Sequence, residues 1–167
     1  MNLKTTHTFP IDVKTFWEKL YFHEEYNRAL YLTQIGAKSY EVVECKDTEK
    51  TLTRRVKITP KQSAPSILQK MLKGEFTYVE EGTFHKADGT YRFQITPSMM
   101  PEKIKVSGVV TAVAAGDKSV KRTIDLSLKA DVFAVGGQIE KFVGGEITRG
   151  YDESYEFTMG WIKKHGL

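Results

Sequence analysis

Residues 123–132 read TIDLSLKADV and alternate strictly between polar and apolar side chains. Successive side chains of a β-strand point to opposite faces of the sheet, so this alternation is typical of a strand with one buried and one wet face. Ile124, Leu126 and Leu128 fall on the apolar side. The stretch therefore predicts an antiparallel sheet that is covered on one face and open to water on the other.

A candidate cover for that sheet follows directly in the sequence. Residues 138–164 place apolar side chains at steps of three and four, the period of an α-helix, and charged side chains on the other side. An amphipathic helix of this length spans ~37 Å and can cross a strongly curved sheet of about six or seven strands. The predicted apolar side carries Ile139, Phe142, Val143, Ile147, Tyr151, Ser154, Thr158, Trp161 and Ile162.

Further strands are predicted upstream of residue 123. Apolar side chains alternate in residues 91–95, and the Asp88–Gly89 pair just before them is a strong hairpin signal. Alternating segments also occur around residues 40–42, 52–58, 76–84 and 104–110. Consecutive strands joined by short turns imply a meander.

The N-terminal part of the chain combines one strand with two short helices. Residues 2–9 have strand-like side chains and end at Pro10, after which Asp12 offers an N-cap for a helix. A second helical pattern runs from about Glu24 to Thr33 and ends at Gly36. The predicted fold class is therefore α+β, with a strand, two short helices, about six antiparallel strands and one long closing helix.

The composition is that of one ordinary globular domain. At 167 residues the chain fits a single domain, 1–167, and its 28% of charged residues with 40% hydrophobic residues excludes wholesale disorder. A lone cysteine, Cys45, cannot form an internal disulfide, and we expect it to be a buried small hydrophobe in a reducing compartment. No segment reads as a signal peptide or a membrane span, so a cytoplasmic location is expected.

Three segments carry a resemblance to a known superfamily. They are THTFPIDV (residues 6–13) followed by Phe16 and Trp17, then EFTYVEEGTF (residues 75–84) with its Asp88–Gly89 turn, and the closing helix with Gly144–Gly145. Together with the element order, they resemble a bacterial branch of the START-like, or SRPBCC, superfamily. That resemblance implies the helix-grip fold, in which the sheet wraps around the C-terminal helix and leaves a cavity. It does not fix a function, because the superfamily hosts lipid carriers, hydrolases, cyclases and folding cofactors.

No motif predicts a specific chemistry. The four histidines lack metal-ligand spacing, and the sequence contains neither a nucleophile motif nor a phosphate-binding glycine loop. We therefore expect no catalytic residue, no metal and no cofactor. The net charge of +4 is a mild excess without a long basic run, so nucleic-acid binding is not expected either.

Charged residues at inward positions of the predicted strands are the first candidate site. Arg54, Glu80 and Arg122 each share a face with apolar neighbours. A charge inside a cavity is costly unless it is paired. One interpretation is that Arg54 or Arg122 grips the polar head of a ligand. The other is that these arginines pair with Glu44 or Glu80, or that a bulge exposes them.

A second candidate is a gate at the cavity mouth. Residues 63–74 predict a short helix whose apolar face could cover the mouth or rest on a membrane during ligand transfer. The alternative is a helix that only packs on the edge of the sheet. The candidate gate or membrane-contact residues are Ile67, Leu68, Met71, Leu72, Met99 and Met100.

Four glycines in the closing helix are the third unusual feature. Gly144, Gly145, Gly150 and Gly160 each cost about 1 kcal/mol relative to alanine in a helix interior. Three interpretations are open: the glycines let the helix approach the sheet closely, they leave room for a bulky ligand beneath it, or they permit the helix to bend and open the cavity.

The leading functional prediction is the binding, with transfer as a further role, of a hydrophobic small molecule such as a lipid or a sterol-like compound. Arg54, Glu80 and Arg122 would supply polar contacts, and membrane contact would be transient. The alternative is a cyclase- or hydrolase-type enzyme in the same cavity, and a third option is an interaction domain with a filled core. The predicted apolar lining consists of Tyr78, Tyr91, Phe93, Val106, Val110, Leu126 and Leu128 on the sheet and Phe142, Ile147 and Tyr151 on the helix.

Overall fold

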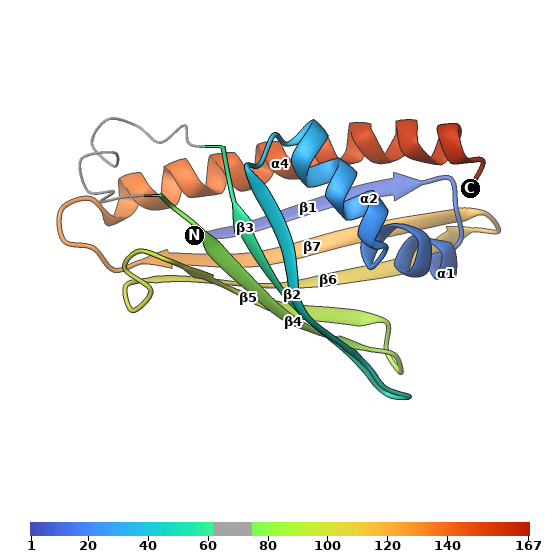
Figure 1. The fold of residues 1–167 in the computed structure, drawn as a ribbon, viewed down its shortest axis with the longest axis horizontal. Helices are drawn as coiled ribbons and strands as arrows, with labels where there is room; N and C mark the ends of the chain where they lie inside the picture. Colours follow the sequence, from blue (N-terminus) through green and yellow to red (C-terminus); the bar gives the residue numbers. More distant parts are fainter. Residues whose placement is uncertain (62–74) are drawn as a thin grey trace.

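A computed structural model describes residues 1–61 and 75–167. Within these ranges, seven antiparallel strands form one sheet in the order β1-β7-β6-β5-β4-β3-β2 (Figure 1). This confirms the predicted α+β helix-grip class and the meander from the second strand onward. The strands are β1 (Asn2–Phe9), β2 (Ser39–Asp47), β3 (Thr51–Thr59), β4 (Tyr78–His85), β5 (Thr90–Pro97), β6 (Ile104–Gly116) and β7 (Ser119–Ala130).

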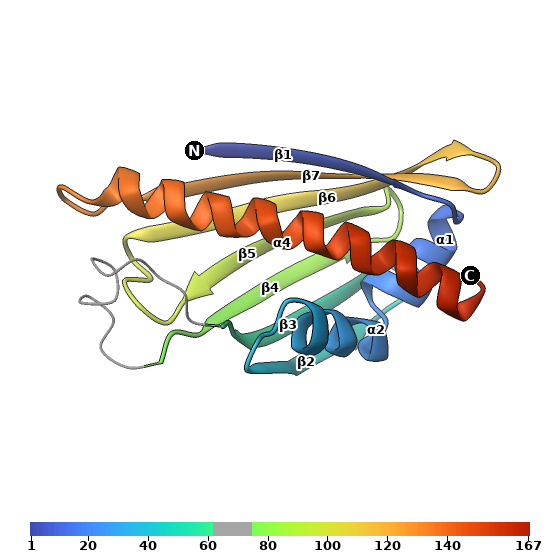
Figure 2. The same cartoon turned by 90° about the horizontal axis from the view of Figure 1, so that it is seen from above.

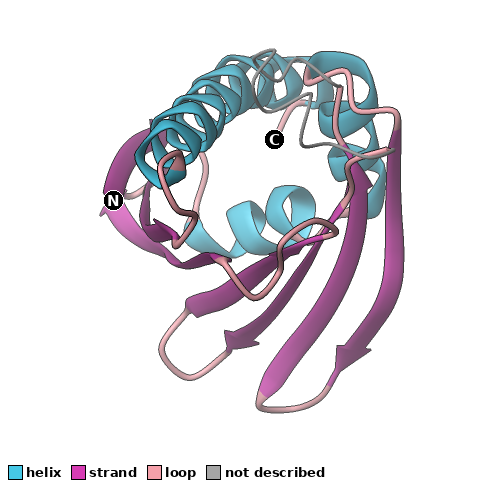
Figure 3. Ribbon diagram, turned by 90° about the vertical axis from the view of Figure 1, so that its left-hand side faces the viewer, coloured by secondary structure: helices cyan, strands magenta, loops and turns pink. Residues whose placement is uncertain are grey.

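The long closing helix α4 (Gly136–His165) runs across the inner face of the sheet and packs against β7 and β1 (Figure 2). It begins two residues before the predicted start. A side chain at Gly136 would overlap the carbonyl oxygen of Ala130, so only glycine lets the chain turn this sharply from β7 into the helix. In the end-on view of Figure 3 the sheet curls below α4, and the N-terminal helices close the other side.

The N-terminal helices depart from regular α-helix. Asp12 caps the first one as predicted, since its Oδ1 accepts a hydrogen bond from the Thr15 backbone N–H at 2.9 Å. The helix then widens into a π-helical segment, which buries Phe16 and Trp17. The second predicted helix also ends in a π-helical segment. Their bounds are α1 (Val13–Thr15), η1 (Phe16–Tyr21), α2 (Glu24–Ala29) and η2 (Leu30–Gln34).

The main hydrophobic core lies between the sheet and α4. The alternation predicted for residues 123–132 is confirmed in β7, where every second residue from Val120 to Ala130 is buried. A smaller cluster of Ala37, Tyr40, Val56 and Ile58 lies at the other edge of the sheet. No helix in the described part of the chain is long and apolar enough to cross a membrane.

The expectation of a buried Cys45 was wrong. Its thiol is free and exposed. Cys45 is on β2 and lies opposite Arg54 of β3. β2 is the last strand in the sheet order, so among the described residues it has a neighbouring strand on one side alone. A register shift between Val42 and Glu44 also interrupts the simple alternation on which the expectation depended.

Candidate functional site

Three polar side chains meet on the inner face of the sheet. Arg54 on β3 and Glu80 on β4 form an ion pair with 3.4 Å between Nη2 and Oε1, and their side chains are only 10% and 13% exposed. The hydroxyl of Tyr91 on β5 donates a hydrogen bond to the same Oε1 at 2.9 Å. Arg54 also donates from Nη1 to the backbone carbonyl of Tyr21 at 3.1 Å. Of the two interpretations for Arg54, the structure therefore supports pairing with Glu80.

The surroundings of Arg54 keep its guanidinium charged. Burial lowers the pKa of Arg54, but the adjacent Glu80 carboxylate and the surrounding tyrosines together raise it by more, so the net shift is upward. Burial, followed by the charge of Glu80, raises the pKa of Tyr78 and Tyr91. These tyrosines are therefore neutral hydrogen-bond donors at physiological pH.

Arg122 on β7 points inward as well, and its environment is different. Its Nη2 lies 2.9 Å from Nδ1 of His7, which sits directly opposite on β1, and its Nη1 lies 3.5 Å from Oγ of Ser154 on α4. Because a guanidinium can only donate, Nδ1 of His7 must accept, and the imidazole proton must sit on Nε2. That nitrogen is 3.6 Å from Oδ1 of Asp152.

His7 should make folding stability dependent on pH. Burial lowers its pKa below the ordinary value of 6.5, and the Arg122 charge lowers it further, whereas Asp152 opposes the shift. The ring of Tyr155 also stacks on His7 at 4.8 Å. The unfolded chain then takes up a proton at higher pH than the folded protein. We expect stability to be fully present above pH 6.5 and to fall below it by at most about 1.4 kcal/mol per pH unit.

The measurement is a series of urea titrations at pH values between about 5 and 8, the range in which histidine side chains change their charge. His7→Asn is the matched variant, because the amide oxygen can still accept from Arg122 but does not titrate. Its stability should change less between these limits than that of the parent protein. Equal slopes in both proteins would contradict the assignment to His7.

The predicted apolar lining is on the inner side of the molecule. Tyr91, Phe93, Val106, Val110, Leu126 and Leu128 are almost fully buried, with exposures of 0–6%. Tyr78 is half-buried and packs against the smaller cluster. On α4, Ile147 and Tyr151 are half-buried against the main core, and Phe142 is half-buried without contributing to it. Those that keep accessible surface are therefore Tyr78, Phe142, Ile147 and Tyr151.

The glycines of α4 divide into two kinds. A Cβ added at Gly144 would lie 2.6 Å from Sδ of Met1, so this glycine allows close packing on β1. A Cβ added at Gly145, Gly150 or Gly160 would meet no atom of the described residues within 4 Å. Gly145 and Gly160 are exposed, but Gly150 is half-buried and lies on the same helix face as Ile147 and Ser154. Beside Gly150, on the helix face that it shares with Ile147 and Ser154, the described residues therefore leave open space.

The predicted gate is only partly described. Ile67, Leu68, Met71 and Leu72 lie outside the described residues. Met99 and Met100 are half-buried in the turn between β5 and β6, where the Met100 carbonyl accepts hydrogen bonds from the backbone N–H groups of Lys103 and Ile104. Their part in a gate stays a prediction.

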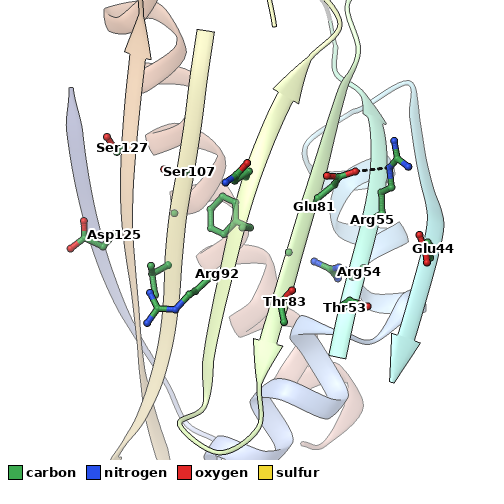
Figure 4. Close-up of a pocket in the computed structure, with 15 residues that line it drawn as sticks. Glu44, Thr53, Arg54, Arg55, Glu81, Thr83, Arg92, Ser107, Asp125 and Ser127 are labelled. Atoms are coloured by element: carbon green, nitrogen blue, oxygen red, sulfur yellow. Dashed lines mark ion pairs between the residues drawn. The ribbon is translucent and has the colours of Figure 1, made fainter. Parts of the chain in front are cut away.

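A separate hollow of about 710 Å³ lies on the outer face of the sheet (Figure 4). Polar side chains line most of it, including Thr83, Arg92 and Gln94, and Arg55 pairs there with Glu81 at 2.8 Å. This face carries the polar half of the strand alternation, so the hollow is not the predicted cavity between sheet and helix.

Sequence reasoning missed several residues near the polar groups. Tyr21 and Phe22 place their rings 5.6 Å and 5.4 Å from the Arg54 guanidinium, and Phe22 also packs against Phe84. They lie at the end of the π-helical segment, where a regular helical period gives the wrong direction. His7 was missed because nothing in the sequence specifies that the first strand pairs with the last.

Solved structures of other proteins share this fold. A START superfamily protein from Mycobacterium smegmatis is 11% identical with a TM-score of 0.60, over 98% of this chain and 97% of that chain. The Zhui aromatase/cyclase from Streptomyces sp. R1128 is 11% identical with a TM-score of 0.64, over 100% and 96%. Norcoclaurine synthase from Thalictrum flavum is 11% identical with a TM-score of 0.64, over 99% and 87%.

These similarities confirm the START-like, SRPBCC fold that the sequence resembled, and at such low identity they show the fold alone. No curated protein matches the chain. A family model described as "Protein of unknown function (DUF2505)" matches residues 4–162. Because the match covers almost the whole chain, the protein belongs to this family.

Proposed function

We propose that this protein binds a hydrophobic small molecule between the sheet and α4. The observation that carries the proposal is a set of side chains between the sheet and α4 that keep accessible surface. Tyr78, Ile147 and Tyr151 pack against the hydrophobic clusters, yet each is only half-buried. Apolar and aromatic surface of this kind, with a few polar groups beside it, is typical of a ligand site.

The space beside Gly150 supports the same proposal. A glycine inside a helix costs about 1 kcal/mol relative to alanine, and no atom of the residues that the structure describes requires a glycine at this position. A ligand under the helix would account for the missing side chain. Its apolar part would gain about 25 cal/mol for each Å² removed from water.

The test is to fill that space. Gly150→Leu should weaken ligand binding at least about 10-fold, because a leucine side chain would occupy ligand volume, while helix propensity rises by up to about 1 kcal/mol. Gly145→Leu is the matched control, since it brings the same gain in propensity on the exposed side of α4. Organic extracts of the freshly purified proteins would be compared by mass spectrometry, together with the binding of a fluorescent lipid.

A lipid-like or sterol-like mass that co-purifies with the parent protein and with Gly145→Leu, but not with Gly150→Leu, is the expected result. Loss of the ligand in both variants would place the effect in the helix rather than in the cavity. Absence of any ligand from the parent, together with no binding of the fluorescent lipid, would refute the proposal.

An enzymatic reaction in the same space is the second candidate function. The observation in its favour is that Arg54 and Tyr91 both donate a hydrogen bond to the same carboxylate oxygen of Glu80. General acid–base catalysis needs polar groups within hydrogen-bonding distance of one another. It ranks second because the same three groups satisfy one another and thereby stabilise the interior. Chemical conversion of the co-purified ligand by the protein would reverse that order.

We place this function in the cytoplasm, with transfer of the ligand between membranes as its physiological role. The free, exposed thiol of Cys45 supports a reducing compartment. Vesicle-to-vesicle transfer of a fluorescent lipid by the purified protein is the direct measurement of that role.

A further inference from the structure

Arg122 is a buried cation that has no carboxylate partner within residues 1–61 and 75–167. The residue is 4% exposed. A guanidinium has five N–H donors, and among the described residues only His7 Nδ1 and Ser154 Oγ accept from it. Its Nε has no hydrogen-bond partner in the part of the chain that the structure describes. Asp152 reaches it only through His7 and is itself 65% exposed.

Arg54 differs from Arg122 in having a carboxylate partner among the described residues. Arg54 is also almost buried, but Glu80 on the neighbouring strand neutralises it at 3.4 Å. Arg122 has instead the rings of Phe9 and Tyr151, whose centroids lie 5.1 Å and 5.7 Å from its guanidinium carbon. Aromatic faces stabilise a cation less than a carboxylate does, so Arg122 carries an incompletely compensated charge.

Arg122 also contacts α4 close to Gly150. Ser154, its hydroxyl partner, lies one helical turn beyond Gly150 on the same face of α4. Tyr151, which faces the guanidinium, is the residue next to Gly150 and keeps accessible surface. A molecule that fills the space at Gly150 would therefore end beside the guanidinium.

We propose that Arg122 receives the carboxylate of the bound molecule, so that this protein selects hydrophobic monocarboxylic acids. The proposal rests on the proposed function and names its ligand class. A carboxylate matches the planar guanidinium and can accept from two of its N–H groups. The Ser154 hydroxyl, which lies beside the guanidinium, is a further donor. One negative charge balances the one unmatched cation, whereas a doubly charged phosphate would leave a charge unpaired in the interior.

The test compares acids with alcohols of the same shape. Binding of oleic acid and oleyl alcohol, and of 1-pyrenebutyric acid and 1-pyrenebutanol, would be measured on the parent protein and on Arg122→Met. We expect the parent to prefer the acid of a pair at least about 10-fold, and Arg122→Met to lose about 10- to 100-fold in acid affinity while its alcohol affinity stays within about threefold.

The ligand-free variant gives an independent readout. Removing an uncompensated buried charge should raise the Tm of Arg122→Met, whereas a purely structural arginine would lower it on removal.

The parent protein alone can overturn the proposal, so the test does not depend on the variant folding. Equal affinity of the parent for acid and alcohol in both pairs would refute the role of Arg122 and leave the proposed function standing. Binding of neither member of either pair would refute both.

Discussion

Replacing Glu80 by leucine is expected to destabilise the protein by about 3–5 kcal/mol, since removal of one partner from a buried ion pair leaves an uncompensated charge. Arg54 would keep its hydrogen bond to the Tyr21 carbonyl but lose its neutralising carboxylate. Tyr91 would lose the acceptor of its hydroxyl as well. Urea denaturation monitored by tryptophan fluorescence measures the change.

The neighbouring residue supplies a matched control. Glu81 pairs with Arg55 at 2.8 Å, and both of those side chains are about half exposed on the outer face. Glu81→Leu should therefore cost at most about 1 kcal/mol. The two substitutions make the same chemical change one residue apart, on opposite faces of β4. Similar losses for both would contradict the assignment of a buried, mutually dependent Arg54–Glu80 pair.

A double substitution separates the value of the pair from the cost of breaking it. Arg54→Met/Glu80→Leu replaces both charges by apolar groups of similar size, and such exchanges are often neutral or stabilising. We expect it to recover most of the stability that Glu80→Leu loses. If it does, the charges are not needed for folding, and their place inside the sheet is better explained by contact with a polar part of the ligand.

Most of the fold could be predicted because its signals are local. The period-two alternation of β7, the Asp88–Gly89 turn and the helical period of residues 138–164 each follow from neighbouring residues. The exposed Cys45 could not be predicted in the same way. Its environment depends on which strand lies at the edge of the sheet and on a register shift, and both are properties of the whole sheet.

The candidate site, too, could be predicted only where neighbouring residues determine it. Strand parity placed Arg54, Glu80 and Arg122 inward, and the structure agrees. Parity cannot say which inward charges meet, because that depends on strand order. Arg54 and Glu80 lie on adjacent strands and pair. Arg122 is on β7, two strands beyond Tyr91, and lies opposite His7 of β1, a strand from the other end of the sequence.

Gly82 is expected to be the other highly sensitive position, although a lone glycine in a strand attracts little attention in a sequence. It lies opposite Arg54 on β3, and the ring of Tyr91 crosses the place where a side chain would be. A Cβ at this position would overlap both Cζ and the hydroxyl oxygen of Tyr91. Gly82→Ala must therefore displace the ring whose hydroxyl donates to Glu80, and we expect it to cost about 3 kcal/mol from overpacking and the weakened hydrogen bond.

The cause of that loss can be isolated by removing the ring. In a Tyr91→Ala background the overlap no longer exists, so the further change Gly82→Ala should cost less than about 0.5 kcal/mol, and the two substitutions should be strongly non-additive. Urea denaturation of the parent, the two single variants and the double variant gives the coupling free energy. If Gly82→Ala were equally damaging in both backgrounds, its effect would come from the backbone of β4, and the Tyr91 ring would not be what holds Glu80 in place beside Arg54.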